Sequence, residues 1–194
     1  MQNQILEILK NAVQVKAAIL TDANLVDELE RVSNCLVDVF KNGSKLMLCG
    51  NGGSAADAQH IAAELSGRFY FDRAPLDAEA LHVNTSYLTA VANDYSYDKI
   101  YSRMVTARGK KGDALIAIST SGNSGNVIEA VKAANEMGVI TIGFTGKDGG
   151  KMNALCDYLI KAPSDDTPRI QECHILFAHL LCEIIEGTLF KSED

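Results

Sequence analysis

Four polar side chains on two predicted helices have the spacing that chemistry would require. His60 and Glu64 are four positions apart, which places both on one face of a helix, one turn apart. Gln171 and His179 are eight positions apart, a little over two turns, so they also share a face. If both faces line one cleft, two imidazoles and a carboxylate converge, which suits zinc, although glutamine is an uncommon zinc ligand. From the spacing alone, ordinary surface or satisfied buried side chains are the simpler explanation for the same four residues, because any helix can carry His and Glu.

A hydroxyl-rich turn is the second candidate, with the sequence Ser119-Thr120-Ser121-Gly122-Asn123-Ser124. It follows an apolar run at 114–118 and precedes an amphipathic helical pattern. Backbone N–H groups, a helix dipole and hydroxyls therefore converge at one point, which suits a phosphate. A helix cap needs one hydroxyl, whereas this turn offers four. The turn predicts a phosphorylated small-molecule ligand.

A glycine-rich turn, Gly50-Asn51-Gly52-Gly53-Ser54, follows the apolar run 46–49. Adjacent glycines let the backbone approach a ligand closely, and Ser54 is expected to cap the following helix. The pattern is neither a Walker P-loop nor a dinucleotide-binding fingerprint. A tight strand-to-helix turn explains it as well as a binding loop does. Asn93-Asp94 follows a short predicted helix, where a helix end and turn is the simple explanation, and the glycine-rich loop 145–150 is assigned no chemistry.

Alternating strand and helix patterns predict how these residues are positioned. Strands are expected at 45–49, 79–83, 114–119, 139–144 and 157–161. The third and fourth are nearly continuous apolar runs, as in parallel strands buried on both faces. Helices are expected at 54–66, 86–91, 99–107, 123–137 and about 168–186, the last with apolar residues around much of its circumference. The alternation predicts an α/β fold with a doubly wound, flavodoxin-like, five-stranded parallel sheet, whose ligands bind at the carboxyl edge of the strands, where both turns lie.

Two amphipathic helices precede the sheet. Leu25, Leu29 and Phe40 lie on the apolar face of the second, Thr21 or Asp22 is its expected cap, and it is expected to end near 43. Their apolar faces suit contacts with another subunit or packing on their own domain. We therefore predict a single domain over 1–194, with a helical pair at 1–43 and an α/β core at 44–194.

The composition limits the possible partners. The chain has 194 residues, is 47% hydrophobic, and carries a net charge of −7 with no basic stripe, which argues against a general nucleic-acid surface. No run approaches the roughly 18 apolar residues that cross a bilayer. The N-terminus lacks the pattern of a signal peptide, so a cytoplasmic location is expected. Five cysteines, an odd number without CxxC spacing, are expected to be buried free thiols.

Together these motifs resemble a known family. The turn STSGNS after a strand is similar to that of the sugar isomerase (SIS) domain. The run GNGGSAADAQH at 50–60, with Glu64, resembles the phosphoheptose isomerase branch. So do Asn93-Asp94, the run TGKDGGKM at 145–152, and RIQE at 169–172 followed by His179. The resemblance covers essentially the whole chain. One departure is Pro168, where some relatives have an acidic residue, so a local contact there is in doubt.

The resemblance implies an aldose–ketose isomerase that converts D-sedoheptulose 7-phosphate to D-glycero-D-manno-heptose 7-phosphate. That reaction begins the synthesis of nucleotide-activated heptoses for lipopolysaccharide or capsule. The resemblance further implies a homotetramer with active sites between subunits and one zinc ion per subunit, held by His60, Glu64, Gln171 and His179. Glu64 and His179 would be the acid/base pair of an enediol mechanism. The implied substrate contacts are Asn51, Gly52, Gly53, Glu64, Asn93, Asp94 and Gln171, with Ser119, Thr120, Ser121 and Ser124 around the phosphate.

Three points stay open at this stage. Some SIS relatives are non-catalytic regulators that bind a replication initiator, although such a module need not keep all four of the polar helix residues. An isomerase acting on another ketose phosphate would use the same chemistry. A carboxylate bound to zinc is also a weaker base, so either Glu64 leaves the metal during turnover or the metal is partly structural.

Overall fold

Five short apolar segments pair into one parallel sheet. In the computed structural model, which describes residues 1–190, the strand order is β2-β1-β3-β4-β5. The strands are β1 (Leu46–Gly50), β2 (Ala78–Ala80), β3 (Ala114–Ile118), β4 (Ile140–Thr145) and β5 (Tyr158–Lys161). Every pairing between neighbours is parallel. This order is that of a doubly wound, flavodoxin-like sheet, so the predicted fold class is confirmed.

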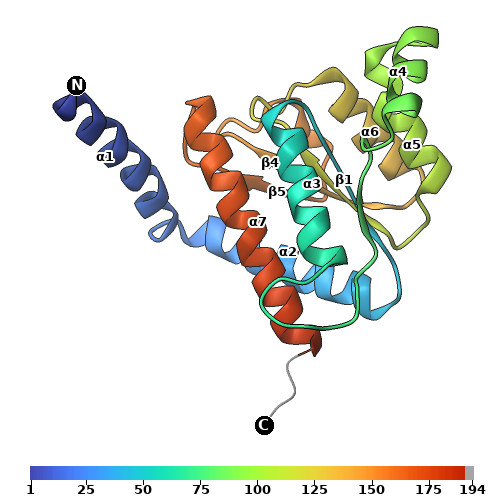
Figure 1. The fold of residues 1–194 in the computed structure, drawn as a ribbon, viewed down its shortest axis with the longest axis horizontal. Helices are drawn as coiled ribbons and strands as arrows, with labels where there is room; N and C mark the ends of the chain where they lie inside the picture. Colours follow the sequence, from blue (N-terminus) through green and yellow to red (C-terminus); the bar gives the residue numbers. More distant parts are fainter. Residues whose placement is uncertain (191–194) are drawn as a thin grey trace.

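Helices cover both faces of this sheet (Figure 1). Side chains alternate along β1, so that Leu46 and Leu48 pack into one core and Met47 and Cys49 into the other. The first core is closed by α2 (Ala23–Lys41), α3 (Gly53–Ser66) and α7 (Thr167–Phe190). The second is closed by α4 (Thr85–Asp94), α5 (Ile100–Arg108) and α6 (Gly125–Glu136). Short 3₁₀ turns, η1 (Tyr97–Lys99) and η2 (Gly150–Ala154), complete the connections.

The two N-terminal helices differ in how they are packed. In α2 the predicted apolar face is buried, and the Asp22 carboxylate caps the helix by accepting from the Leu25 backbone N–H at 3.1 Å. Helix α1 (Gln2–Ile19) instead projects from the body of the fold, and Ile19 is its one buried residue (Figure 1). Several of its large apolar side chains are exposed, namely Ile5, Leu6, Ile8, Leu9 and Val13. The predicted apolar face of the first helix is therefore uncovered in the isolated protomer.

Helix α7 is long and apolar enough to meet the length and composition of a membrane span. A core helix of a globular protein meets the same criteria, and 44% of the apolar window of α7 is buried within the fold. Its buried side chains include Phe177, Leu181 and Ile185, which belong to the core beneath the sheet. The broad apolar surface predicted for this helix is thus explained in part by packing within the fold.

Three local expectations are wrong. Strand β2 ends at Ala80, so His82 lies in the following turn rather than in a strand, because only three residues of this edge strand pair with β1. Helix α4 continues to Asp94, so Asn93-Asp94 forms its last turn rather than following it. Ser54 is not a cap, because α3 already begins at Gly53, and its N-cap is Gly52, whose φ of 57° suits glycine.

The cysteines agree in part with expectation. All five are free thiols; Cys49, Cys173 and Cys182 are buried, whereas Cys35 and Cys156 are half-buried. Burial raises the pKa of the Cys182 thiol to about 12, and that of Cys156 likewise to about 12. These two thiols are therefore protonated and unreactive at neutral pH.

Candidate functional site

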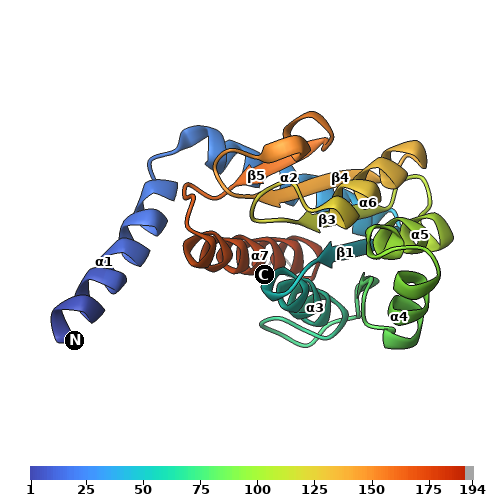
Figure 2. The same ribbon diagram turned by 90° about the horizontal axis from the view of Figure 1, so that it is seen from above.

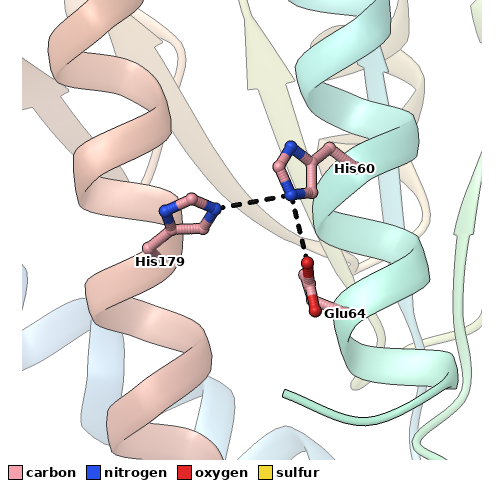
Figure 3. Close-up of side chains that lie close together, drawn as sticks. All are labelled: His60, Glu64 and His179. Atoms are coloured by element: carbon pink, nitrogen blue, oxygen red, sulfur yellow. Dashed lines mark hydrogen bonds and ion pairs between the residues drawn. The ribbon is translucent and has the colours of Figure 1, made fainter. Parts of the chain in front are cut away.

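Helices α3 and α7 bring His60, Glu64 and His179 together (Figure 3). The His60 Nε2 atom lies 3.1 Å from Glu64 Oε1 and 3.4 Å from His179 Nε2. The two imidazole rings meet edge to face, with centroids 5.0 Å apart. All three ligand atoms lie within 4.8 Å of one another. The structure thus brings three of the four residues together, a convergence that the spacing left conditional.

The two helices meet because each starts at the carboxyl edge of the sheet. Helix α3 follows β1, and α7 follows β5. Near their starts the Gln171 side chain lies against Gly53, where an added Cβ would be only 2.5 Å from Gln171 Nε2. A larger residue at 53 would therefore displace the Gln171 amide from this position. The helices run side by side (Figures 1 and 2), and the cluster lies about 10 Å further along α3.

The cluster has the chemistry and the spacing of a zinc site. Imidazole nitrogen and carboxylate oxygen are the usual donors, at about 2.0–2.2 Å from the ion. Two such donors at a tetrahedral angle are then roughly 3.3–3.5 Å apart. The distances from His60 Nε2, 3.1 Å to Glu64 and 3.4 Å to His179, are close to this value. The three side chains therefore fit a zinc ion, and an open position would remain for substrate.

An acidic residue that the sequence reasoning missed lies beside this cluster. Asp57 is three positions before His60 on α3 and half-buried, and its Oδ2 atom is buried without a hydrogen-bond partner. Burial raises the pKa of the Asp57 carboxyl, and the neighbouring His60 and His179 oppose that rise. The i, i+3 spacing to His60 was the sequence signal that could have identified it.

Gln171, the fourth predicted metal ligand, does not join the cluster within the protomer. It is eight positions before His179, a rise of about 12 Å along α7. Its amide lies instead against Gly53, in the first turn of α3. This position groups Gln171 with the predicted substrate contacts, and its role as a metal ligand stays a prediction.

The hydroxyl-rich turn is held in shape mainly by its own hydrogen bonds. Ser119 is buried, and its hydroxyl lies 2.9 Å from the Ser124 hydroxyl. Gly122 N–H donates to the Ser119 carbonyl at 2.9 Å, and the φ of Gly122 is 64°. Ser121 is exposed and its hydroxyl accepts from the backbone N–H of Asn123, while Thr120 is half-buried. With Ser124 as the N-cap of α6, the turn presents hydroxyls at the positive end of a helix, as a phosphate site requires.

A second glycine-rich loop, 145–152, supports this turn, although the sequence reasoning assigned it no chemistry. Gly146 N–H donates to the Thr120 carbonyl at 2.9 Å, and Met152 N–H donates to the Gly122 carbonyl at 3.3 Å. An added Cβ at Gly122 would lie 2.1 Å from the Gly149 carbonyl oxygen. The loop therefore acts as a backing layer whose glycines permit contact between the two backbones.

The Asn51 side chain links the two turns. Its amide and that of Asn126, the buried second residue of α6, donate to each other reciprocally, both at 2.8 Å. Tyr97 also donates to Asn51 Oδ1, at 3.2 Å. Asn93 and Asp94 are exposed at the end of α4 and bond to each other at 2.9 Å. Their predicted contact with substrate stays a prediction.

The remaining two histidines lie outside the cluster and are assigned no chemistry. His174 is fully buried, and its Nε2 donates to the Thr145 carbonyl at 3.1 Å. Burial lowers the pKa of His174 to about 4, so the ring is neutral in the folded protein at neutral pH. Burial also lowers the pKa of His82.

Known proteins share both the sequence and the backbone described above. A family model described as the SIS domain matches residues 10–146. The phosphoheptose isomerase of Aneurinibacillus thermoaerophilus is 49% identical over 193 residues, covering 100% of this chain and 98% of that protein. The phosphoheptose isomerase of Clostridium acetobutylicum is 50% identical over 190 residues, covering 98% and 97%. The solved phosphoheptose isomerase of Neisseria gonorrhoeae superposes with a TM-score of 0.90 at 43% identity, covering 96% of this chain and 98% of that one.

Proposed function

The chain belongs to the phosphoheptose isomerases of the SIS-domain family and is an isomerase, and from this premise we propose that it converts D-sedoheptulose 7-phosphate to D-glycero-D-manno-heptose 7-phosphate. The observation that carries the proposal is the convergence of His60, Glu64 and His179 from helices α3 and α7. A merely sugar-binding module has no need of two imidazoles and a carboxylate in contact between two helices that start at the carboxyl edge of the sheet.

Glu64 and His179 supply the proton transfers in this proposal. Aldose–ketose isomerisation moves a proton between C1 and C2 through an enediol, which needs a base at carbon and an acid at oxygen. Both side chains are partly exposed at the cluster and lie on different helices, so they can act from two sides of one sugar. Which of them removes the carbon proton is left open by the proposal.

The far end of the substrate is held by the turn Ser119–Ser124. Its hydroxyls and the N-terminus of α6 bind the phosphate, with the loop 145–152 as a rigid support. Binding energy from the phosphate then orients the reacting carbons at the cluster. Asn51, Gly52, Gly53 and Gln171, near the starts of α3 and α7, are proposed to contact the sugar hydroxyls, as are Asn93 and Asp94.

One zinc ion per subunit is the proposed cofactor, held by His60, Glu64 and His179. When bound there, zinc supplies Lewis-acid polarisation of the oxygens on C1 and C2. The proposed fourth ligand, Gln171, would have to move from its place against Gly53 or be supplied across a subunit boundary.

We also propose a homotetramer with active sites between subunits, in the cytoplasm, acting in nucleotide-activated heptose synthesis. The exposed apolar side chains of α1 support assembly, because an isolated helix with such a face gains stability when another surface covers it. The His60 side chain is 46% accessible, so residues of a neighbouring subunit have room to cover the cluster and complete the site.

A coupled assay on a small panel of ketose phosphates, with and without zinc, tests the proposal. Sedoheptulose 7-phosphate is expected to give the highest kcat/KM, with activity dependent on the metal. Preference for a pentulose or hexulose phosphate would reassign the substrate. Absence of turnover on every member of the panel, with binding of sugar phosphate retained, would instead support a non-catalytic regulator.

A further inference from the structure

A buried ion pair lies at the end of the α3–α7 helix pair, below the His/Glu cluster. Arg73 Nε donates to Glu186 Oε1 at 3.0 Å, and the two side chains are only 2% and 1% exposed. Arg73 belongs to the segment 67–74 that follows α3, whereas Glu186 is on α7, seven positions after His179. Seven positions are two helical turns, so Glu186 and His179 share a face of α7.

Arg73 caps the last turn of α3, which includes the residue that carries the proposed acid/base carboxylate. Its guanidinium donates to the backbone carbonyls of Glu64 at 2.9 Å, Leu65 at 2.7 Å and Gly67 at 3.1 Å. The last carbonyls of a helix have no partner within the helix, and a cation at that end also complements the helix dipole. A single side chain therefore fixes the backbone at Glu64 and connects it to α7.

Glu186 organises the other half of the connection. Its carboxylate accepts from the backbone N–H groups of Phe69 at 2.9 Å and Tyr70 at 2.6 Å, besides Arg73. Burial alone would raise the pKa of Glu186, but these donors together lower it, so the carboxylate is ionised at neutral pH. The segment held in this way places the Phe69 ring against His179, with centroids 5.7 Å apart.

We propose that Arg73 and Glu186 are positioning residues for catalysis, setting the separation and orientation of Glu64 on α3 and His179 on α7. The inference rests on the proposed acid/base roles of those two residues. Neither positioning residue reaches the ligand atoms of the cluster; each acts through the backbone at residue 64 or through Phe69. Misplacement of a catalytic group by about 1 Å can lower turnover roughly 100-fold. An ion pair that holds α3 and α7 in place next to these groups therefore has a large effect on the chemical step.

The test compares Glu186→Gln with a matched control, Asp113→Asn. Asp113 is also a buried carboxylate that accepts from two backbone N–H groups, those of Lys45 and Lys110, and pairs with the Lys45 ammonium at 2.9 Å. It directly precedes β3, and its partners Lys45 and Lys110 belong to neither α3 nor α7. Both variants are expected to lower Tm. Only Glu186→Gln is expected to lower kcat, at least tenfold, with KM changed less than about twofold, and to shift the pH profile of kcat.

Two milder variants keep the test decisive if Glu186→Gln fails to fold. Phe69→Leu leaves the ion pair and the backbone donors intact but removes the ring beside His179, and is expected to lower kcat about threefold to tenfold. Arg73→Lys keeps the positive charge but loses the several N–H donors of the planar guanidinium. Its kcat is expected to lie between the values of the wild type and Arg73→Met. Unchanged kcat and pH profile in the folded variants, despite a lower Tm, would show a purely structural role and overturn the inference.

The assay separates this inference from the proposed function. Wild-type turnover of sedoheptulose 7-phosphate, and its loss in Glu64→Gln, are measured in the same experiment. If the wild type turns over no sugar phosphate, or Glu64→Gln remains active, the proposed roles fail regardless of what the Arg73 and Glu186 variants do. If the wild type is active and Glu64→Gln is inactive, the proposed function stands. If the Arg73 and Glu186 variants then show the kcat and pH profile of the wild type, only the positioning inference fails.

Discussion

The phosphate turn and the His/Glu cluster are built in opposite ways. The hydrogen bonds within the turn Ser119–Ser124 join residues at most five positions apart, and the loop 145–152 adds further hydrogen bonds from behind. The cluster joins His60 to His179 across 119 positions of sequence. The first region is shaped largely by residues close in sequence, whereas the second exists only through the packing of α3 against α7. Ligand class can therefore be encoded in a short motif, but the chemistry depends on the whole fold.

The largest expected effect comes from removing the carboxylate of the cluster. Glu64→Gln keeps the side-chain volume but removes the basic oxygen, so turnover is expected to fall at least about 1,000-fold, within the range for an essential proton-transfer group. Substrate should still bind through the intact turn, as measured by calorimetry with sedoheptulose 7-phosphate. Glu30→Gln, on the exposed face of α2, is the control. Near-normal turnover in Glu64→Gln would remove this residue from the mechanism.

Removing metal probes the cluster without changing a residue. Exhaustive chelation is expected to reduce kcat at least about 100-fold, because Lewis-acid polarisation contributes several kcal/mol to the barrier. Added zinc should restore activity in proportion to the metal bound, and magnesium, which prefers oxygen donors, should not. A metal-free preparation with full activity would exclude zinc from the reaction.

Variants of the turn Ser119–Ser124 are expected to weaken substrate binding more than they slow the chemical step, in contrast to variants of the cluster. Ser119→Ala and Ser124→Ala each remove one of two hydroxyls that lie 2.9 Å apart. Each should raise KM about threefold to tenfold, as the loss of one charge-assisted hydrogen bond implies. Because the hydroxyls are partners, the double variant should lose less than the product of the single effects. A larger effect on kcat than on KM would contradict the division of roles between the two regions.

The last predicted effect is on stability and not on catalysis, and it concerns His174, which connects α7 to the carbonyl of Thr145 at the start of the supporting loop. Its pKa of about 4 in the folded state lies below the unfolded value near 6.5, so the unfolded chain binds the proton first as the pH falls. The stability that the neutral ring contributes is complete above pH 6.5 and should be lost between pH 6.5 and 4, at about 1.4 kcal/mol per pH unit. Urea unfolding at pH 7, 6 and 5 measures this loss.

His174→Gln is the matched variant, because its amide can still donate to the Thr145 carbonyl but does not titrate. Its unfolding free energy should depend less on pH than that of the wild type over this range. If the unfolding free energies of the two proteins depend on pH in the same way, His174 is not the cause of the stability loss at low pH.

The sequence predicted the sheet well and the site in part, for physical reasons. Strands β3 and β4 are nearly uniform apolar runs, so their burial and parallel pairing were readable. Edge strand β2 has three residues and weak patterning, and its end was misplaced past His82. Periodicity placed His60 and Glu64 on one face of one helix, but it could not determine how far along α7 the helices meet.

That distance determines which side chains join the cluster. Because of the position at which α7 packs against α3, His179 lies beside His60, whereas Gln171 lies beside Gly53. The residues that were missed entirely, such as Asp57, Arg73 and Glu186, matter through burial and backbone hydrogen bonds, which a spacing pattern does not contain.

The separation of His60 from His179 also has a consequence for the order of events during folding. Local structure such as a turn forms early, whereas a contact across 119 positions must first overcome the entropy of closing a long loop. Helix α7 lies at the end of the described chain, and domains emerge from synthesis N-terminus first. The complete trio of ligands therefore appears only when α7 docks. Recovery of activity after dilution from denaturant should therefore lag behind the recovery of helical signal. The delay between the two signals would measure how long the docking of α7 takes.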